Sequence, residues 1–302
     1  MCKICPKQKK ALAFLVAIGG AFVGFYMMFS MTMKPSVAQK PIVVVSTFAL
    51  YDIARNIASD TVEIKTVVPL GSDPHAYSPT PSDIATFSKA SIFFINGAGF
   101  EGWVENLKNT LPSQVVMVDM SEHVGLLDND PHYWLSIDNM IEMTREIQRQ
   151  FSTLSPKNRT VYEANAYRYI ESLQKLKQQY EIGLKECKNR TLVTNHNAFG
   201  YLAYANNLKN ISIIGLSSDE QPSAKKMVEI STLMQKEKIS TIFFEELIDD
   251  NVAQTIAKSS GAHAKSLQPL ENITQSEFDN NETYISIMGN NLVKLRSAME
   301  CH

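Results

Sequence analysis

Short apolar runs separated by helical periodicities extend from residue 41 to about residue 118. Runs rich in β-branched and aromatic residues, or with alternating apolar positions, are typical of buried strands. We expect four such strands, at residues 41–46, 62–69, 90–96 and 115–118. Between them, apolar spacing or a proline near the first turn indicates helices at residues 48–57, from residue 80 onward, and at 103–110. Strands that alternate with helices predict a parallel sheet covered by helices on both faces.

The segment from Pro156 to Cys187 has a different pattern. Gly183 is its only glycine, and apolar or aromatic residues recur every three or four positions. This stripe consists of Tyr162, Ala166, Tyr169, Leu173, Leu176, Tyr180 and Leu184. A helix of about 30 residues would be about 45 Å long, which exceeds an ordinary crossover helix. We interpret it as a backbone helix that joins two lobes, with its aromatic stripe buried in packing.

The alternation of strands and helices resumes after this segment. Strands are predicted at residues 191–194, 211–216, 239–244 and 264–267, and helices at 202–206, 223–236, 252–259 and 282–299. The predicted fold is therefore α/β, with two similar lobes, each a mainly parallel sheet flanked by helices, joined by one long helix. We place the N-terminal lobe at residues 39–152, the linking helix at 153–188 and the C-terminal lobe at 189–302.

Residues 1–38 have the pattern of a targeting segment. Basic residues between Lys3 and Lys10 precede an uncharged apolar run from Ala11 to about Met33, and Ser36-Val37-Ala38 offers small residues for signal-peptidase cleavage. The prediction is a cleaved signal peptide. The alternative is an uncleaved anchor in the inner membrane, because about 20 apolar residues are enough to span a bilayer. Both outcomes place the body of the chain in the periplasm or another extracytoplasmic space.

Charge and composition exclude several classes of protein. Hydrophobic residues make up 44% and charged residues 20% of the chain, which is typical of a globular protein and not of a disordered one. The formal net charge is −2, and the targeting segment contains five of the lysines and no acidic residue. The remaining chain is therefore acidic, and no nucleic-acid partner is expected.

The cysteines fall into two groups. Cys2 and Cys5 precede the apolar run, so neither is placed to be the modified cysteine of a lipoprotein. Cys187 and Cys301 belong to the body of the chain. An oxidising compartment would allow these two to pair, but the sequence does not fix the distance between them, and a disulfide stays open.

Three of the six histidines follow strands or turns in similar contexts. His75 and His132 each end an Asp-Pro-His tripeptide, and His196 follows the first strand of the second lobe. Ligand sites in doubly wound sheets lie at the carboxyl ends of strands, so these side chains could converge in the cleft between the lobes. Imidazole is a common ligand of Zn²⁺ and related metals. Intervals of 57 and 64 residues between the histidines carry little information by themselves.

Several motifs, in order along the chain, resemble those of the metal-ion solute-binding proteins of ABC importers, the zinc, manganese and iron class. The resemblance covers essentially all of residues 41–299. Its segments are Val43–Ile53, Pro69–Asp83, Asn96–Trp103, Asp130–Leu135, Thr194–Tyr201, Glu220–Ser223, Ile242–Glu245 and Thr283-Tyr284 with Asn291. The resemblance implies two α/β lobes joined by a long helix, with a divalent metal held between them.

The resemblance also implies a function and a set of ligands. Proteins of this class are not enzymes; they deliver the metal to a membrane permease and its ATPase. The ligand positions transfer to His75, His132 and His196. We expect the chain to act as a monomer.

The fourth ligand departs from the family pattern. Where many members have a carboxylate in an L-D-P-L-like segment, this chain has Gln268 in Leu267-Gln268-Pro269-Leu270. An amide is a neutral and poorer ligand, so Glu245 is the other candidate, and water is a third. Gln221 also replaces a glutamate that is common before Pro-Ser in the family. Three imidazoles favour Zn²⁺, whereas Mn²⁺ and Fe²⁺, the alternatives, prefer more oxygen ligands.

Two other functions remain as alternatives. Three histidines with an open fourth position also occur in secreted zinc hydrolases, although the sequence has no His-Glu-x-x-His motif and Glu245 is the only candidate general base. A surface adhesin or a metal-storage protein could use the same fold, since a fold does not fix a function.

Overall fold

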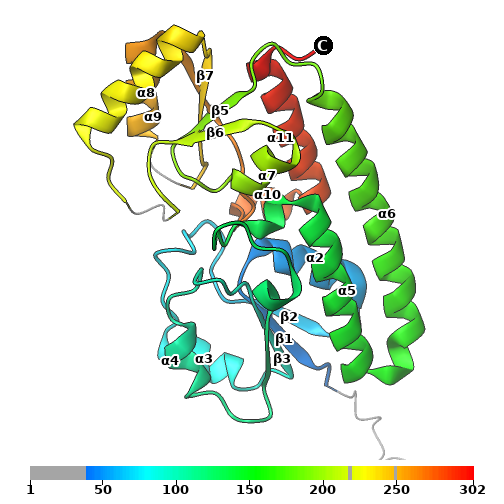
Figure 1. Cartoon of the computed structure of the whole chain (residues 1–302). Coiled ribbons are helices and arrows are strands. Elements are labelled where there is room, and N and C mark those ends of the chain that lie inside the picture. Colours follow the sequence, from blue (N-terminus) through cyan, green and yellow to red (C-terminus); the bar gives the residue numbers. More distant parts are fainter. Residues whose placement is uncertain (1–38, 217–219, 248–249) are drawn as a thin grey trace, which may run out of the picture. The chain divides into compact units, whose positions relative to one another are not determined.

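The computed structural model describes residues 39–216, 220–247 and 250–302 (Figure 1). The chain divides into two units, Met1–Lys40 and Pro41–His302, and the fold below is that of the second. The predicted targeting segment, residues 1–38, lies outside the described residues. Within the described part of the chain, no helix is both long enough and apolar enough to cross a membrane.

A four-stranded parallel sheet forms the core of the N-terminal lobe, with strand order β2-β1-β3-β4. Alternate residues of each strand face opposite sides of the sheet: Val43 and Val45 pack toward α2 and the long helices, whereas Val44 packs toward α3 and α4. The elements are β1 (Ile42–Val45), α2 (Phe48–Ala58), β2 (Glu63–Thr66), α3 (Pro81–Phe87), β3 (Ile92–Ile95), α4 (Val104–Lys108) and β4 (Val116–Asp119). Helices therefore cover both faces.

The C-terminal lobe repeats this topology. Its four parallel strands have the order β6-β5-β7-β8. The elements are β5 (Thr191–Thr194), α7 (Gly200–Ala205), β6 (Lys209–Ser212), α8 (Ala224–Glu237), β7 (Thr241–Phe244), α9 (Asn251–Ser260) and β8 (His263–Ser266). In each sheet the chain moves outward in opposite directions from the two central strands, which creates a topological switch point at their carboxyl ends.

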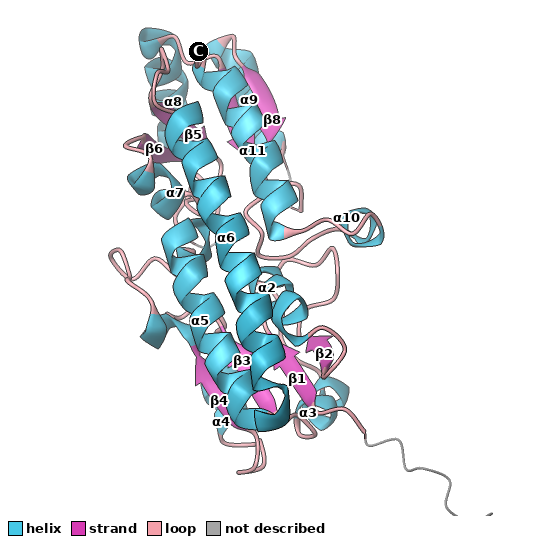
Figure 2. Ribbon diagram, turned by 90° about the vertical axis from the view of Figure 1, so that its right-hand side faces the viewer, coloured by secondary structure: helices cyan, strands magenta, loops and turns pink. Residues whose placement is uncertain are grey.

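Long helices run beside both lobes (Figure 2). The longest, α6 (Arg159–Gly183), packs against α5 (Ile137–Leu154), α2 and α11 (Tyr284–Met299). Its predicted aromatic stripe, including Tyr162, Tyr169 and Tyr180, is buried in the main hydrophobic core. Shorter elements complete the fold, namely the 3₁₀ turns η1 (Met120–His123), η2 (Tyr133–Leu135) and η3 (Pro156–Asn158), and α10 (Gln275–Asp279).

The predicted fold class is confirmed, with local differences. The sequence analysis missed α5 and α10. Helix α5 is hard to recognise because its buried face includes polar residues such as Asn139 and Thr144. Strand β6 begins at Lys209, two residues before the predicted start, and ends at Ser212 because its ladder partner β5 ends at Thr194. The limits proposed for the lobes and the linking helix stay a prediction.

Cys187 and Cys301 form a disulfide, which answers the question that the sequence left open. The bond joins the chain shortly after α6 to the residue that follows the C-terminal cap of α11. Both long helices are therefore tied together at this end.

Candidate metal centre

The three predicted histidines lie in loops at the carboxyl ends of strands. His75 is in the loop after β2, His132 is in the connection after β4, and His196 follows β5 by two residues. The structure brings these side chains together, with ring centroids 4.9 Å apart for His132 and His196 and 5.3 Å apart for His75 and His196. Parallel strands direct these loops to one edge of each sheet, and the two edges face each other.

The two Asp-Pro-His tripeptides form the same local turn. The backbone N–H of His75 donates to Oδ1 of Asp73, and that of His132 donates to Oδ1 of Asp130, both at 2.9 Å. An aspartate that accepts from the residue two positions later forms an Asx turn. The proline fixes the intervening backbone, so each tripeptide holds its histidine in a defined direction.

A fourth side chain, Glu271, joins the three histidines. It lies in the loop between β8 and α10, yet backbone bonds hold this loop to the N-terminal lobe. The carbonyl of Glu271 accepts from the N–H of Phe48 at the start of α2, and the side-chain amide of Asn272 donates to the carbonyls of Pro69 and Ser72. Glu271 therefore reaches the centre from the N-terminal side, with His75 and His132.

One potential ligand atom from each of His75, His132, His196 and Glu271 lies within 4.8 Å of the other three. These side chains are at most 7% exposed. Within the described residues, His75 Nε2, His132 Nε2 and Glu271 Oε1 make no hydrogen bond of good geometry, although Glu271 lies 3.1 Å from His132 Nε2 and 3.4 Å from His75 Nε2 as an ion-pair partner. Buried polar atoms without partners are rare and costly, and here they converge on one point. This arrangement is suited to a cation that accepts electron pairs from all four groups.

Two carboxylates hold the far nitrogens of two imidazoles. His132 donates from Nδ1 to Oδ1 of Asp130 at 2.7 Å, and His196 donates from Nδ1 to Oε1 of Glu245 at 2.6 Å. A carboxylate on one ring nitrogen fixes the ring and raises the basicity of the other nitrogen, as in many metal centres. Nε2 of His196 contacts the carbonyl of Leu216 at 3.0 Å. With both Nδ1 atoms held by carboxylates, the Nε2 atoms are the natural ligand atoms of His132 and His196, and a metal at His196 would displace the contact to Leu216.

The centre concentrates opposite charges in a buried space. Burial opposes the protonation of His196, but the charge and hydrogen bond of Glu245 outweigh it and raise the pKa of His196 to about 9. Burial likewise opposes protonation of His75 and His132, yet the nearby carboxylate of Glu271, and for His132 also that of Asp130, raises both pKa values. Burial would raise the pKa of Glu271, but His132 and His75 lower it strongly. Protons therefore compete with any bound cation.

Neither of the fourth-ligand candidates from the sequence lies among the four clustered side chains. Glu245 pairs with His196. The Nε2 group of Gln268 donates to Glu277, and Oε1 of Gln268 accepts from the N–H of Leu270. Sequence reasoning missed Glu271, which is three residues beyond Gln268. An acidic residue directly after the Leu267–Leu270 segment was the signal that could have found it.

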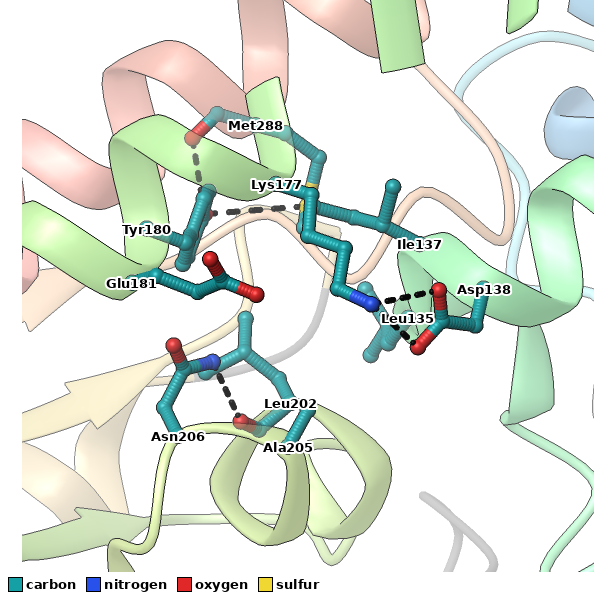
Figure 3. A pocket seen from close by; sticks show the side chains of 10 residues that line it. All are labelled: Leu135, Ile137, Asp138, Lys177, Tyr180, Glu181, Leu202, Ala205, Asn206 and Met288. Carbon is teal, nitrogen blue, oxygen red and sulfur yellow. Dashed lines mark hydrogen bonds and ion pairs between the residues drawn. The ribbon is translucent and has the colours of Figure 1, made fainter. Parts of the chain in front are cut away.

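Another pocket lies where η2 and α5 meet α6, α7 and α11 (Figure 3). Its volume is about 30 Å³, and its wall includes Leu135, Leu202 and the ion pair between Lys177 and Asp138. None of the clustered side chains lines it. A space of this size has little room beyond a water molecule.

Comparison with known proteins places this geometry in a family. The family model ZnuA, described as "Zinc-uptake complex component A periplasmic", matches residues 43–298. The chain belongs to the ZnuA family. This result confirms the resemblance to metal-ion solute-binding proteins, since the matched segment contains both lobes and all four clustered side chains.

Curated relatives of the ZnuA family agree with this assignment. The chain is 33% identical over 278 residues to the zinc-binding lipoprotein AdcA of Streptococcus pneumoniae, a match that includes 85% of this chain and 56% of AdcA. The chain thus spans little more than half of AdcA. It is 31% identical to the high-affinity zinc uptake system protein ZnuA of Bacillus subtilis over 85% of this chain and 87% of that protein.

Solved structures of ZnuA-like proteins share the fold. The Zn(II)-bound ZnuA-like domain of S. pneumoniae AdcA has a TM-score of 0.77 at 33% identity, over 86% of this chain and 99% of that domain. The laminin-binding protein Lmb of Streptococcus agalactiae, described as having adhesin and metal-transporting activity, has a TM-score of 0.80 at 28% identity, over 86% and 99% of the respective chains. The two-lobed architecture is therefore that of metal-binding transport proteins.

Proposed function

We propose that this protein binds Zn²⁺ outside the cytoplasm and delivers the ion to the permease of an ABC importer, which its ATPase drives. The convergence of His75, His132, His196 and Glu271, with three unpartnered ligand atoms among them, carries this proposal. We assign all four side chains as ligands, with Glu271 in the fourth position in place of Glu245 or Gln268.

The ligand set favours zinc. Three imidazole nitrogens and one carboxylate oxygen suit the tetrahedral, nitrogen-rich coordination that Zn²⁺ prefers. Mn²⁺ and Fe²⁺ usually take more oxygen ligands, and Glu271 is the one carboxylate in the cluster. The zinc-binding names of AdcA and of the ZnuA relative point in the same direction.

The placement of the ligands supports transport. His75, His132 and Glu271 are held by the N-terminal lobe, whereas His196 comes from the C-terminal lobe. A bound ion would therefore bridge the two lobes, and their separation at the permease would remove one ligand and weaken its binding. We expect a monomer to be sufficient, since one chain supplies all four groups.

Hydrolysis is a weaker interpretation of the same centre. A zinc hydrolase keeps an open coordination position and a general base near its substrate. Glu271 fills the fourth position in this cluster, and Glu245, the only candidate base, is occupied with Nδ1 of His196. The observations therefore favour binding and release over catalysis.

Elemental analysis and calorimetric titration of the purified protein test this proposal. We expect about one zinc per chain, tighter binding of Zn²⁺ than of Mn²⁺, and loss of zinc in a His132→Ala variant. A His263→Ala variant is a suitable control, because His263 is exposed and lies outside the cluster. Absence of zinc uptake by the wild-type chain, or equal uptake by His132→Ala, would overturn the proposal.

A further inference from the structure

Asp130 contacts both His132 and the C-terminal lobe. Its Oδ1 accepts hydrogen bonds from the backbone N–H of His132 at 2.9 Å and from the ring Nδ1–H at 2.7 Å. Its Oδ2 faces Gly200, the first residue of α7, so closely that a Cβ atom on Gly200 would lie 2.7 Å away. One carboxylate thus separates a proposed ligand of the N-terminal lobe from the backbone of the C-terminal lobe.

The next residue of α7 contacts the same turn. The hydroxyl of Tyr201 donates to the carbonyl of Asp130 at 2.9 Å and accepts from the N–H of Leu127 at 2.8 Å. Asp130 and Leu127 are themselves joined by a backbone hydrogen bond. The start of α7 therefore fixes the backbone of the loop that contains His132, through Tyr201. Through Gly200, it also limits the space available to the carboxylate of Asp130.

The start of α7 also lies close to His196 in the sequence. Residues 196–201 supply His196, Gly200 and Tyr201, so one short segment of the C-terminal lobe carries a proposed ligand and two contacts to the loop of His132. We infer that Asp130 is a positioning residue, through which the C-terminal lobe orients His132 for metal when the two lobes are together. This inference rests on the proposed function. It adds that contact between the two lobes, acting through Asp130 on His132, controls the affinity for zinc.

Gly200 is the point at which this inference can be tested without changing any ligand. A methyl group at residue 200 cannot coexist with Oδ2 of Asp130 in its present position, because Cβ contacts below 3.0 Å are essentially never seen. The carboxylate must then shift, and we expect this shift to weaken the bonds that its Oδ1 makes to His132. Loss of an outer partner of a metal-bound histidine typically weakens metal binding about 10-fold to 100-fold, and Gly200→Ala should fall in this range.

A double-mutant cycle separates this effect from a general disturbance. We would measure zinc affinity, by competition with a chromophoric chelator, for wild type, Gly200→Ala, Asp130→Ala and the double variant. If the methyl group acts through Asp130, its cost of about 10-fold or more should shrink to less than about 2-fold in the Asp130→Ala background. Asp130→Asn keeps an acceptor oxygen for His132 and should retain more affinity than Asp130→Ala.

Gly289→Ala is the matched control, because the same methyl group in helix α11 would meet no atom within 4 Å. It should bind zinc as wild type does. Equal losses from Gly200→Ala in both backgrounds, or no loss in either, would overturn the inference.

A measurement without metal keeps this test distinct from the test of the proposed function. In the ¹⁵N NMR spectrum of the metal-free chain, the Nδ1–H signal of His132 should report its bond to Asp130 and should change in Gly200→Ala but not in Gly289→Ala. An unchanged His132 signal in Gly200→Ala would overturn the inference whatever the zinc affinities are. A wild-type chain with the expected signals but without zinc uptake would instead contradict the proposed function.

Discussion

The residues at the centre are of two kinds: side chains proposed to bind the metal, and side chains that hold those ligands in place. His75, His132, His196 and Glu271 present the converging atoms, while Asp130 and Glu245 hold the far sides of two imidazoles. Two aromatic side chains also pack against the imidazoles. The ring centroids of Phe100 and His75 are 4.7 Å apart, and those of Trp134 and His132 are 5.4 Å apart. Apolar surroundings strengthen electrostatic interactions within the centre.

Replacement of Glu271 tests the proposed ligand that the sequence analysis missed. Glu271→Gln removes the negative charge and substitutes a neutral amide, so zinc affinity should fall by more than the roughly 10-fold to 100-fold typical of an outer partner. Glu246→Gln is the control, since Glu246 contacts Ser266 and Lys294 outside the cluster. Titration with a competing chelator measures both, and equal affinities of the two variants would argue against Glu271 as a ligand.

The raised pKa of His196 predicts opposite effects of pH on zinc affinity and on the stability of the metal-free chain. Because the pKa is about 9 in the folded chain and about 6.5 in an unfolded one, the proton on His196 stabilises the metal-free fold fully below about pH 6.5. That stability should be lost as the pH rises through about 9, whereas zinc affinity should increase over the same range because the metal displaces the proton.

Glu245→Gln provides the matching variant for the pH measurement. Without the carboxylate charge, the pKa of His196 should fall toward its ordinary value, so both pH dependences should move to lower pH. Urea unfolding of the metal-free protein and chelator competition at several pH values measure them. A zinc affinity of the wild type that is independent of pH between 6.5 and 9 would refute this description of His196.

At the scale of elements, the sequence predicts helices and strands with a periodic apolar pattern. It does not predict loops whose position depends on contacts with distant parts of the chain. The strands of Val43–Val45 and Ile242–Phe244 are recognisable because their side chains are apolar on both faces. The loop of Glu271 has no such pattern, since its position depends on backbone bonds from Phe48 and on the side chain of Asn272. The three histidines could be proposed from their strand-end positions, whereas the only sequence signal for Glu271 was its place directly after the Leu267–Leu270 segment.

The long helix α6 offers a test of packing at this scale. Leu173 is completely buried in the main core, so Leu173→Ala should lower the free energy of unfolding by about 2–5 kcal/mol through lost burial and a residual cavity. Tyr167 lies on the same helix and is 65% exposed; Tyr167→Ala should change stability by less than about 0.5 kcal/mol. Chemical denaturation compares the two, and similar effects would contradict the buried stripe.

At the scale of the molecule, two lobes with the same strand order contribute unequally to one centre. The N-terminal lobe holds three of the four side chains, partly by capturing the Glu271 loop, and the C-terminal lobe contributes His196. A ligand that binds only the folded state stabilises it by an amount that grows with the logarithm of the free ligand concentration above its dissociation constant. Free Zn²⁺ at about 100 times its dissociation constant should therefore raise the free energy of unfolding by about 2.7 kcal/mol.

This stabilisation should depend on ligands from both lobes. Thermal unfolding with and without zinc, repeated for His196→Ala and for the control His263→Ala, measures it. Full stabilisation of His196→Ala by zinc would mean that the ion does not bridge the lobes.

Zinc K-edge X-ray absorption of the loaded protein tests the central claim most directly, because it reports the atoms around the ion. We predict a four-coordinate ion with nitrogen and oxygen neighbours at about 2.0–2.1 Å and the outer-shell signal of three imidazoles. Six-coordinate zinc, or a spectrum with one imidazole or none, would contradict a centre built from His75, His132, His196 and Glu271.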